Sequence, residues 1–374
     1  MVRGEIFSTP PKTQEKEDTM STRRGFIVIF VFTLALTLFL FPPTQNNQAL
    51  AGDLVPGMVD TTHYKKKAPW LAGRAGLGDT NAWMTMFGLH FRYGIEEKYA
   101  KDFKGFKVTS SFWNPIKQIA DIEQLVAQGV DILFVDPASE GALVGAVEEV
   151  YEMGIPVVLV STGVNTDKYT TWVSRDNIKA GFVYAKWMGK KLNGKGNVVV
   201  LMGMAGSSYA EDVLRGVKQG LSAHPDIKIL EVAYCDWSPV KAKETMEVFI
   251  QSNPQIDGII ADGGQMAYGA VEALLDAGKK IPPITADDWN GWLRMAKKHD
   301  IDFIAESGGN PLSLTSVDLA VKILRGEPVP KIVEYPVVTF EKDKLDQYYR
   351  PDLTDQYFAV HQLPEAWIKK HYAK

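Results

Sequence analysis

Hydrophobic and polar positions between Trp70 and Phe340 alternate between two patterns. Short apolar runs such as Asp131–Val135 have the composition of parallel strands that are buried on both faces. Between them lie longer stretches such as Pro115–Gln128, in which apolar residues recur at helical spacing. Regular alternation of this kind predicts an α/β fold with parallel sheets and right-handed crossovers.

The alternation occurs twice along the chain. Strands are expected at 106–112, 131–135, 156–160, 198–202, 227–233, 256–261 and 301–305. Helices are expected at 115–128, 139–153, 177–192, 208–223, 240–251, 265–277 and 312–324, with Ser139 as the N-cap of the second. A βα series built twice predicts two similar lobes.

The first 51 residues have the pattern of an export signal. Two arginines precede the apolar run Phe26–Phe41, two prolines end it, and Ala49-Leu50-Ala51 offers a cleavage site. A membrane anchor is the alternative, but the run is short for a span. The acidic residues before Met20 do not suit such a signal, so we expect initiation at Met20. General and twin-arginine export both stay open.

Composition excludes several classes of protein. Hydrophobic residues form 45% of the chain and charged residues 23%, which excludes wholesale disorder. A net charge of -4 gives no basic excess for binding nucleic acid. The single cysteine, Cys235, excludes an intrachain disulfide, a cysteine-rich metal site and a lipid anchor near the signal exit.

Motifs for catalysis are absent from the sequence. It has no phosphate-binding GxxxxGK[ST] loop, no GxSxG nucleophile elbow and no HExxH zinc motif. The six histidines are scattered. We therefore expect no enzyme activity, no cofactor and no metal site.

Acidic and aromatic residues gather where the predicted strands end, and ligands bind at this edge of α/β sheets. Carboxylates accept hydrogen bonds from vicinal hydroxyls or pair with cations, and tryptophan stacks on sugar rings or cations. Taken singly, such an Asp is often only a helix N-cap and such a Trp is often core. Their convergence predicts a binding cleft lined by Asp79, Asn81, Trp83, Trp113, Asp136, Ser161, Tyr209, Glu211, Trp237, Asp262, Asp287 and Glu306.

Several segments together resemble the type 1 periplasmic solute-binding proteins of the ribose/galactose-binding group. They are QLVAQGVDILFVDPAS (124–139), GIPVVLV (154–160), SRDN (174–177), GMAGSS (203–208), QMAYGAVEAL (265–274) and LRGEPVP (324–330). The resemblance implies two Rossmann-like lobes joined by a three-segment hinge near residues 174, 307 and 337. It also implies a ligand clamped between the lobes and a closed form that a membrane permease recognises.

The resemblance assigns residues to the two lobes. After a leader at 52–67, the N-terminal lobe is expected at 68–174 plus 307–337. The C-terminal lobe is expected at 175–306 plus 338–374, including an aromatic-rich tail.

Some of the family's binding positions carry over residue by residue. Asn81 and Trp83 match the polar and aromatic pair after the first strand, and Trp237 matches the stacking aromatic of the second lobe. Asp287 matches the carboxylate that holds sugar hydroxyls. Glu306 stands where ribose-binding members have glutamine.

Other positions depart from the family pattern. Ser161 and Thr162 replace an Asp-Arg pair, Glu211 replaces an arginine, and Gly263 replaces an asparagine. Arg175 is the guanidinium that remains near the cleft, as a ligand group or as a hinge salt bridge with a neighbouring acid. The loss of arginines argues against a plain pentose or hexose.

Three functions follow as hypotheses. The first is an extracytoplasmic receptor of an ABC importer for a neutral sugar, polyol or glycoside, working as a monomer with a membrane permease. The second is a receptor for a cationic ligand such as an amino sugar or polyamine, in which the acids supply counter-charge. The third is a ligand-sensing partner of a membrane receptor kinase. A DNA-binding repressor is excluded, because an export signal occupies the place of its helix-turn-helix.

The tail after Phe340 is rich in aromatic residues. We expect it to form a strap packed on the second lobe that ends in a helix at Pro364–His371. A permease or oligomer contact is the alternative.

Overall fold

A computed structural model describes residues 57–307 and 309–374. The expected export signal, its cleavage site and the start at Met20 lie outside the described residues. In the described part of the chain, no helix has both the length and the apolar character needed to cross a membrane.

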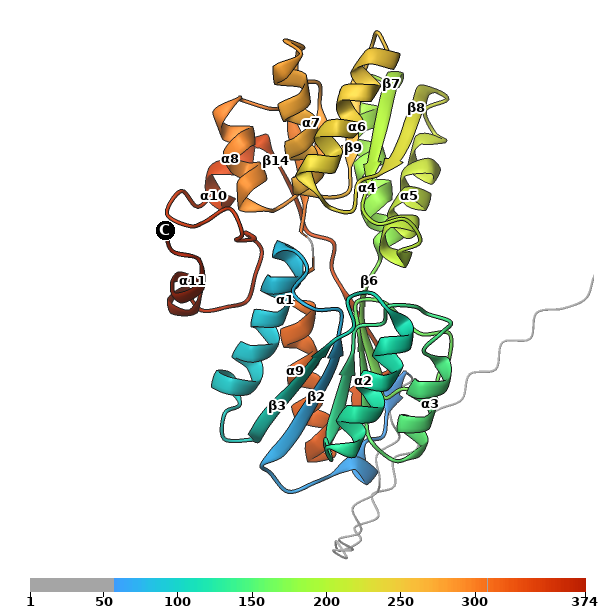
Figure 1. The fold of residues 1–374 in the computed structure, drawn as a ribbon, viewed down its shortest axis with the longest axis vertical. Coiled ribbons are helices and arrows are strands. Elements are labelled where there is room, and N and C mark those ends of the chain that lie inside the picture. Colours follow the sequence, from blue (N-terminus) through green and yellow to red (C-terminus); the bar gives the residue numbers. More distant parts are fainter. Residues whose placement is uncertain (1–56, 308) are drawn as a thin grey trace, which may run out of the picture. The chain divides into compact units, whose positions relative to one another are not determined.

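The first lobe is built on a six-stranded parallel sheet in the order β13-β6-β5-β4-β2-β3 (Figure 1). Its strands are β2 (Trp70–Gly76), β3 (Phe103–Ser110), β4 (Ile132–Val135), β5 (Val157–Val160), β6 (Thr171–Arg175) and β13 (Ile332–Tyr335). Its helices are α1 (Ala82–Arg92), α2 (Pro115–Ala127), α3 (Val144–Glu152) and α9 (Leu312–Arg325). Because successive strand residues face opposite sides, one hydrophobic cluster joins the sheet to α1 and α9 and another joins it to α2 and α3.

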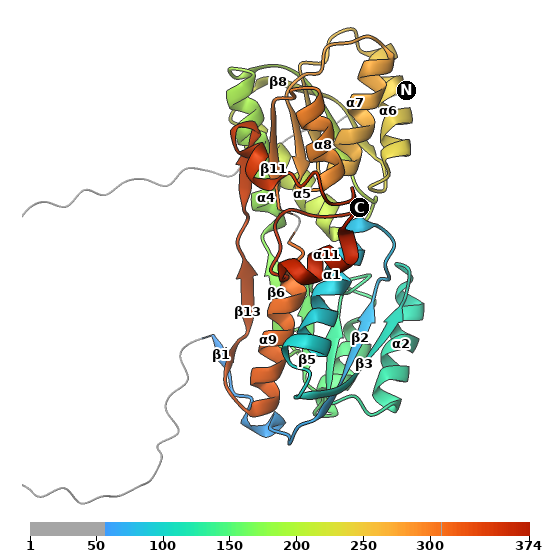
Figure 2. The same cartoon turned by 90° about the vertical axis from the view of Figure 1, so that its left-hand side faces the viewer.

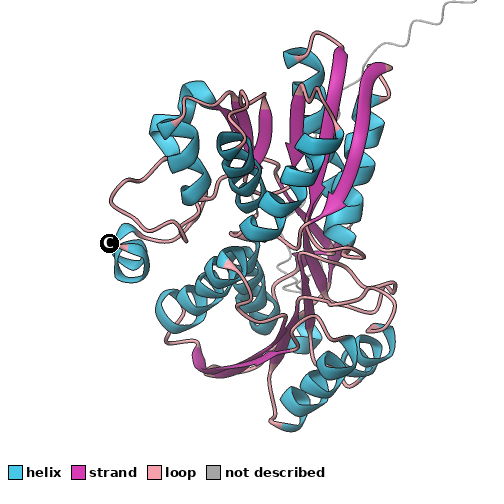
Figure 3. Cartoon of the chain, turned by 45° about the horizontal axis from the view of Figure 1, so that its top comes forward, coloured by secondary structure: helices cyan, strands magenta, loops and turns pink. Residues whose placement is uncertain are grey.

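The second lobe repeats this order as β14-β11-β10-β9-β7-β8. Its strands are β7 (Lys195–Met202), β8 (Asp226–Tyr234), β9 (Gly258–Ala261), β10 (Ile284–Asp287), β11 (Phe303–Glu306) and β14 (Thr339–Glu341), of which β14 runs antiparallel to β11. Its helices are α4 (Asn177–Lys191), α5 (Ser208–Leu221), α6 (Pro239–Ser252), α7 (Gly264–Asp276) and α8 (Asn290–Lys298) (Figure 3). The predicted α/β class with two lobes is confirmed.

The chain passes between the two sheets three times. It leaves the first sheet after Arg175, returns after Glu306 to begin α9, and crosses again between Tyr335 and Thr339. Residues from 57 onward already belong to the first lobe, since β1 (Met58–Val59) pairs with β12 (Val329–Pro330).

Two predicted elements were wrong at their ends. The strand predicted to reach Phe112 stops at Ser110, because Phe112 and Trp113 have φ of 52° and 64° and turn the chain. The helix expected from Ser139 begins at Val144, because the Ser139 hydroxyl caps only a turn by accepting from the Ala142 amide.

Helices α1 and α8 and strands β6, β10, β13 and β14 were not predicted from the pattern. Helix α1 illustrates the reason. Seven of its eleven residues are buried, so its apolar residues do not form one stripe.

The strap, residues 342–374, contains η3 (Lys342–Lys344), α10 (Leu345–Tyr348) and α11 (Glu365–Tyr372). It packs on the second lobe, with Phe340 and Tyr348 stacked at 3.9 Å between ring centroids. It also extends to the first lobe, where α11 lies against α1 (Figure 2). The Trp367 ring lies 5.7 Å from that of Tyr93. The alternative role as a permease or oligomer contact stays a prediction.

Candidate functional site

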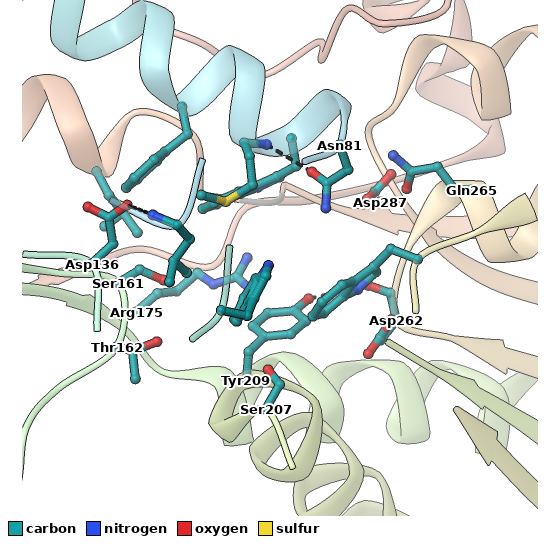
Figure 4. A pocket seen from close by; sticks show the side chains of 17 residues that line it. Asn81, Asp136, Ser161, Thr162, Arg175, Ser207, Tyr209, Asp262, Gln265 and Asp287 are labelled. Carbon is teal, nitrogen blue, oxygen red and sulfur yellow. Dashed lines mark hydrogen bonds between the residues drawn. The ribbon is translucent and has the colours of Figure 1, made fainter. Parts of the chain in front are cut away.

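A pocket lies between the two lobes, at the carboxyl ends of both sheets. Figure 4 shows its lining, which comes from strand ends in each lobe and from the N-terminal halves of α1, α5, α7 and α9. The lining residues are Leu77, Asn81, Trp83, Met84, Phe87, Trp113, Asp136, Ser161, Thr162, Arg175, Ser207, Tyr209, Trp237, Asp262, Gln265, Asp287 and Leu312. Parallel strands bring their carboxyl ends to one edge, and this is why residues so distant in sequence meet here.

Ten of the thirteen predicted site residues line this pocket, and three do not. Asp79 is exposed ahead of α1, and Glu211 is exposed and accepts a hydrogen bond from the Tyr234 hydroxyl at 2.7 Å. Glu306 is fully buried and reaches the pocket only through Arg175. The expectation that all three face the pocket is therefore corrected.

Arg175 joins the ends of β6 and β11 beside two of the crossings. Its Nη1 donates to Glu306 Oε1 at 2.5 Å and to the carbonyl oxygen of Ser307 at 2.6 Å. The guanidinium carbon lies 5.3 Å from the ring centroid of Tyr209. Arg175 is thus a hinge salt bridge whose side chain also lines the pocket. Asp176 is not its partner, because that carboxylate caps α4.

Three buried carboxyl groups lie at or beside the pocket, and two of them, Asp262 and Glu306, interact with this arginine. Burial raises the pKa of Asp262 to about 7, although the Gly203 amide and the Trp237 indole oppose the rise. Burial likewise raises the pKa of Glu306 to about 7 against the opposing charge of Arg175. Burial and the neighbouring Asp288 hold the pKa of Asp287 well above its ordinary value. Groups that change protonation near neutral pH serve as donors or acceptors toward hydroxyls.

Asp262 and Asp287 are also fixed by the backbone. Asp262 Oδ2 accepts from the Gly203 amide at 2.9 Å. Asp287 Oδ1 accepts from the Trp289 amide at 3.0 Å. Each carboxyl group therefore has a defined orientation in the pocket wall.

Asp136 is held within the first lobe. Its carboxylate accepts from Arg74 Nε at 3.1 Å and Nη2 at 2.6 Å, and both side chains are buried. The Arg74 guanidinium also lies 5.2 Å and 4.9 Å from the ring centroids of Phe87 and Phe91. Asp136 lines the pocket, but this ion pair uses most of its acceptor capacity.

Asn81 is the N-cap of α1. Its Oδ1 accepts from the Met84 amide at 2.9 Å, which stabilises the first turn of the helix. The amide nitrogen of Asn81 is left for other partners, and Figure 4 shows the side chain at the pocket wall.

Aromatic rings from both lobes form the remaining wall. The Trp237 ring lies 6.1 Å from Trp113 and 6.0 Å from Tyr209, measured between centroids. In the first lobe, Trp83 stacks on Phe87 at 4.8 Å. Flat apolar faces next to hydrogen-bonding groups suit a ligand with both C–H faces and hydroxyls.

A short sequence repeat places the two tryptophans of the pocket at equivalent positions in the two lobes. The sequence analysis did not identify this repeat. Ser111–Pro115 (SFWNP) and Cys235–Pro239 (CDWSP) follow the equivalent strands β3 and β8. In each copy the tryptophan and the residue before it have positive φ, and the next residue caps a helix that begins with proline. The shared spacing was the signal that could have revealed the pair.

Seven lining residues were not among the predicted ones: Leu77, Met84, Phe87, Thr162, Ser207, Gln265 and Leu312. Two of them lie on α1, which the pattern had not predicted. Gln265 begins a segment that carries the family resemblance, but the direction of its side chain does not follow from the sequence. In residues 57–307 and 309–374, no group of three or more His, Cys, Asp or Glu is placed to hold a metal ion.

Comparisons with known proteins agree with the two-lobed fold. Residues 79–328 match the family model described as periplasmic binding protein domain. The xylitol-binding protein of Mycolicibacterium smegmatis is 33% identical over 233 residues, which cover 61% of this chain and 66% of the relative, just under two thirds of its length. The ribose import binding protein of Bacillus subtilis is 29% identical over 253 residues, covering 67% of this chain and 82% of the relative.

A solved structure shares both fold and sequence similarity. The fructose-binding periplasmic domain of a hybrid two-component system superposes with a TM-score of 0.67 at 26% identity. The match covers 75% of this chain and 93% of that domain.

Proposed function

The chain belongs to the periplasmic binding protein family, and we propose that it is the extracytoplasmic receptor of an ABC importer for a small polyhydroxylated solute. The observation that carries the proposal is the pocket between the lobes, in which tryptophans from each lobe stand beside hydrogen-bonding groups. The names of the relatives support this ligand class, since they bind xylitol, ribose and fructose.

Different side chains of the pocket would bind different parts of the ligand. Trp113 and Trp237 would contact the C–H faces of the ligand, while Asp287, Asn81 and Gln265 would bond to its hydroxyls. The lobes, residues 57–174 with 307–337 and residues 175–306 with 338–374, would close by rotation at the three crossings. Closure buries the ligand and presents a surface for the permease. This function requires no reaction and no cofactor.

Export and partner follow from the same proposal. A receptor of this kind acts outside the cytoplasm, which agrees with the export signal expected in residues 1–51. We propose that the mature protein is a monomer that meets an ABC permease at the membrane.

Native mass spectrometry of freshly purified protein tests the ligand class, because a closed receptor retains its ligand. Calorimetry with the recovered compound should then give saturable binding that Trp237→Ala weakens. Val240→Ala is the matched control, since this side chain lies three residues further on and is 64% exposed outside the pocket. Wild-type affinity in Trp237→Ala would refute the placement of the site.

A cationic ligand is the second candidate, favoured by the charges around the pocket. Asp262, Asp287 and Glu306 are three buried acids at or beside the pocket, and the Arg175 guanidinium interacts with Asp262 and Glu306. A cation would favour the ionised acids, so its affinity should rise between pH 6 and 8 and weaken with salt. Further burial by a neutral ligand favours the protonated acids, so its affinity should fall over the same range.

A sensory partner is the third candidate, favoured by the similarity to the fructose-binding domain of a two-component system. Reconstitution separates it from transport. A transport receptor should stimulate ATP hydrolysis by an ABC importer in proteoliposomes, and a sensor should not.

A further inference from the structure

The strap lies beyond the part of the chain that the family match covers. That match ends at residue 328, and the strap begins at residue 342. The strap therefore lies outside the matched region, and its contacts show how it relates to the two lobes.

One end of the strap is attached to the second lobe. Asn290, fully buried at the start of α8, donates through Nδ2 to the carbonyl oxygens of Arg350, Leu353 and Thr354 at 2.9, 3.2 and 3.0 Å. Its Oδ1 accepts from the Arg350 amide at 3.1 Å. A short antiparallel bridge joins Trp289 to Phe358. These bonds fix the strap to α8.

The other end of the strap contacts the first lobe. The Gln362 amide donates to Nε2 of His90 at 3.3 Å, and Nδ1 of His90 lies 2.9 Å from the carbonyl oxygen of Met86. His90 is fully buried, and burial lowers its pKa to about 3. A neutral ring with its proton on Nδ1 satisfies both bonds. Trp367 of α11 meets Tyr93 with rings inclined at 61°.

Apolar packing joins the same elements. Ala82 and Met86 of α1 belong to one hydrophobic cluster with second-lobe residues such as Trp292. Ile368 and Tyr372 of α11 belong to it too, as do Phe358 and Leu363 of the strap. Figure 2 shows α11 against α1. The core of the second lobe thus continues through the strap to a helix of the first lobe.

Helix α1 contacts the strap with one face and the pocket with a different face. Positions 82, 86, 90 and 93 follow helical spacing and face the strap or the shared cluster. Trp83, Met84 and Phe87 line the pocket. Displacement of α1 from the strap would therefore also move the pocket wall.

We propose that the strap is a fourth, non-covalent link between the lobes, which holds α1 near the second lobe and favours the closed arrangement. Opening the lobes must separate the strap from α1 or from α8, and separation exposes buried apolar side chains. A ligand that binds the closed form binds more tightly when that form is more populated. The effect on affinity rests on the proposed function, whereas the effect on lobe separation does not.

Variants of the full-length chain test the link. Tyr93→Ala and Trp367→Ala each remove one side of the ring contact. Small-angle X-ray scattering of the ligand-free variants should give a larger radius of gyration than wild type. Saturating ligand should restore the wild-type value. Affinity should fall about two- to tenfold, the range that one aromatic pair contributes to an equilibrium. Trp367→Phe should recover most of it.

Asp355→Ala is the matched control. It removes an exposed ion pair between the strap and Arg294 of the second lobe, and it leaves the contacts with α1 in place. Its radius of gyration and ligand affinity should equal those of wild type.

A purely structural strap gives a different result. Lower melting temperatures in Tyr93→Ala and Trp367→Ala, with unchanged radius of gyration and affinity, would overturn the link. If no polyol binds, the ligand-free scattering still decides the matter, because failure of the proposed function leaves that measurement intact.

Discussion

Trp113 of the first lobe and Trp237 of the second lobe face each other with ring centroids 6.1 Å apart and planes inclined by 27°. Both follow an edge strand, and both have positive φ, an uncommon conformation for a bulky residue. Such conformations cost free energy and concentrate at functional sites. The paired turns therefore support the proposal that these two rings form the aromatic part of the binding site.

Trp113→Ala should weaken ligand binding about ten- to a hundredfold, because burial of a large apolar side chain contributes about 1.5–3 kcal/mol. Isothermal titration calorimetry measures the change. Ile116→Ala is the control, since this neighbouring side chain is 79% exposed and should leave affinity unchanged. Equal affinities in the two variants would contradict the assignment of Trp113 to the site.

Gly203→Ala should also weaken binding, although the residue itself offers no side chain to the ligand. A Cβ at this position would overlap the indole of Trp237 and displace it. Gly145→Ala in α3 is the control, because a Cβ there meets nothing within 4 Å. It should leave affinity unchanged and slightly raise the melting temperature. Undisturbed tryptophan fluorescence in Gly203→Ala would argue against the predicted overlap.

Asp262→Asn should make stability less dependent on pH. The folded state holds a proton on Asp262 up to about pH 7, whereas the unfolded chain loses it near pH 4. Between these values the folded state binds more protons, so this group makes stability fall as pH rises. Thermal unfolding from pH 4 to 8 should show a smaller decline in the variant. An identical profile would show that Asp262 is not the buried acid responsible.

Arg175→Ala should lower the free energy of unfolding by about 3–5 kcal/mol, because Glu306 would be left buried without a counter-charge. Denaturant titration measures the loss. The double variant Arg175→Met, Glu306→Gln removes both charges and should recover part of it. A double variant less stable than the single one would contradict the charge argument.

Several features of the site could be predicted from the sequence. Some depend only on interactions between residues close together in the chain, and others follow from the class of fold. Apolar runs and helical spacing identify most strands and helices. Parallel strands bring their carboxyl ends to one edge, so Trp113, Trp237, Asp262 and Asp287 could be assigned to one pocket from their positions alone.

Other features depended on which partner each side chain meets. Asp79, Glu211 and Glu306 also follow strands, yet Asp79 remains exposed, Glu211 binds Tyr234 and Glu306 binds Arg175. Position along the chain does not specify the direction of a side chain in a loop. It also does not show that an acid will form a hydrogen bond or ion pair with a neighbouring hydroxyl or guanidinium group.

The amino-acid sequence alone determined two α/β lobes and the sheet edges at which we propose that ligand binds, since periodicity and strand order depend on nearby residues. Only the tertiary structure decided that α1 is buried on two sides and that the strap joins both lobes. Those contacts link Ala82–Arg92 with residues more than 250 positions away, such as Gln362 with His90. Contacts at that separation form only when the whole chain has packed, so no local pattern records them.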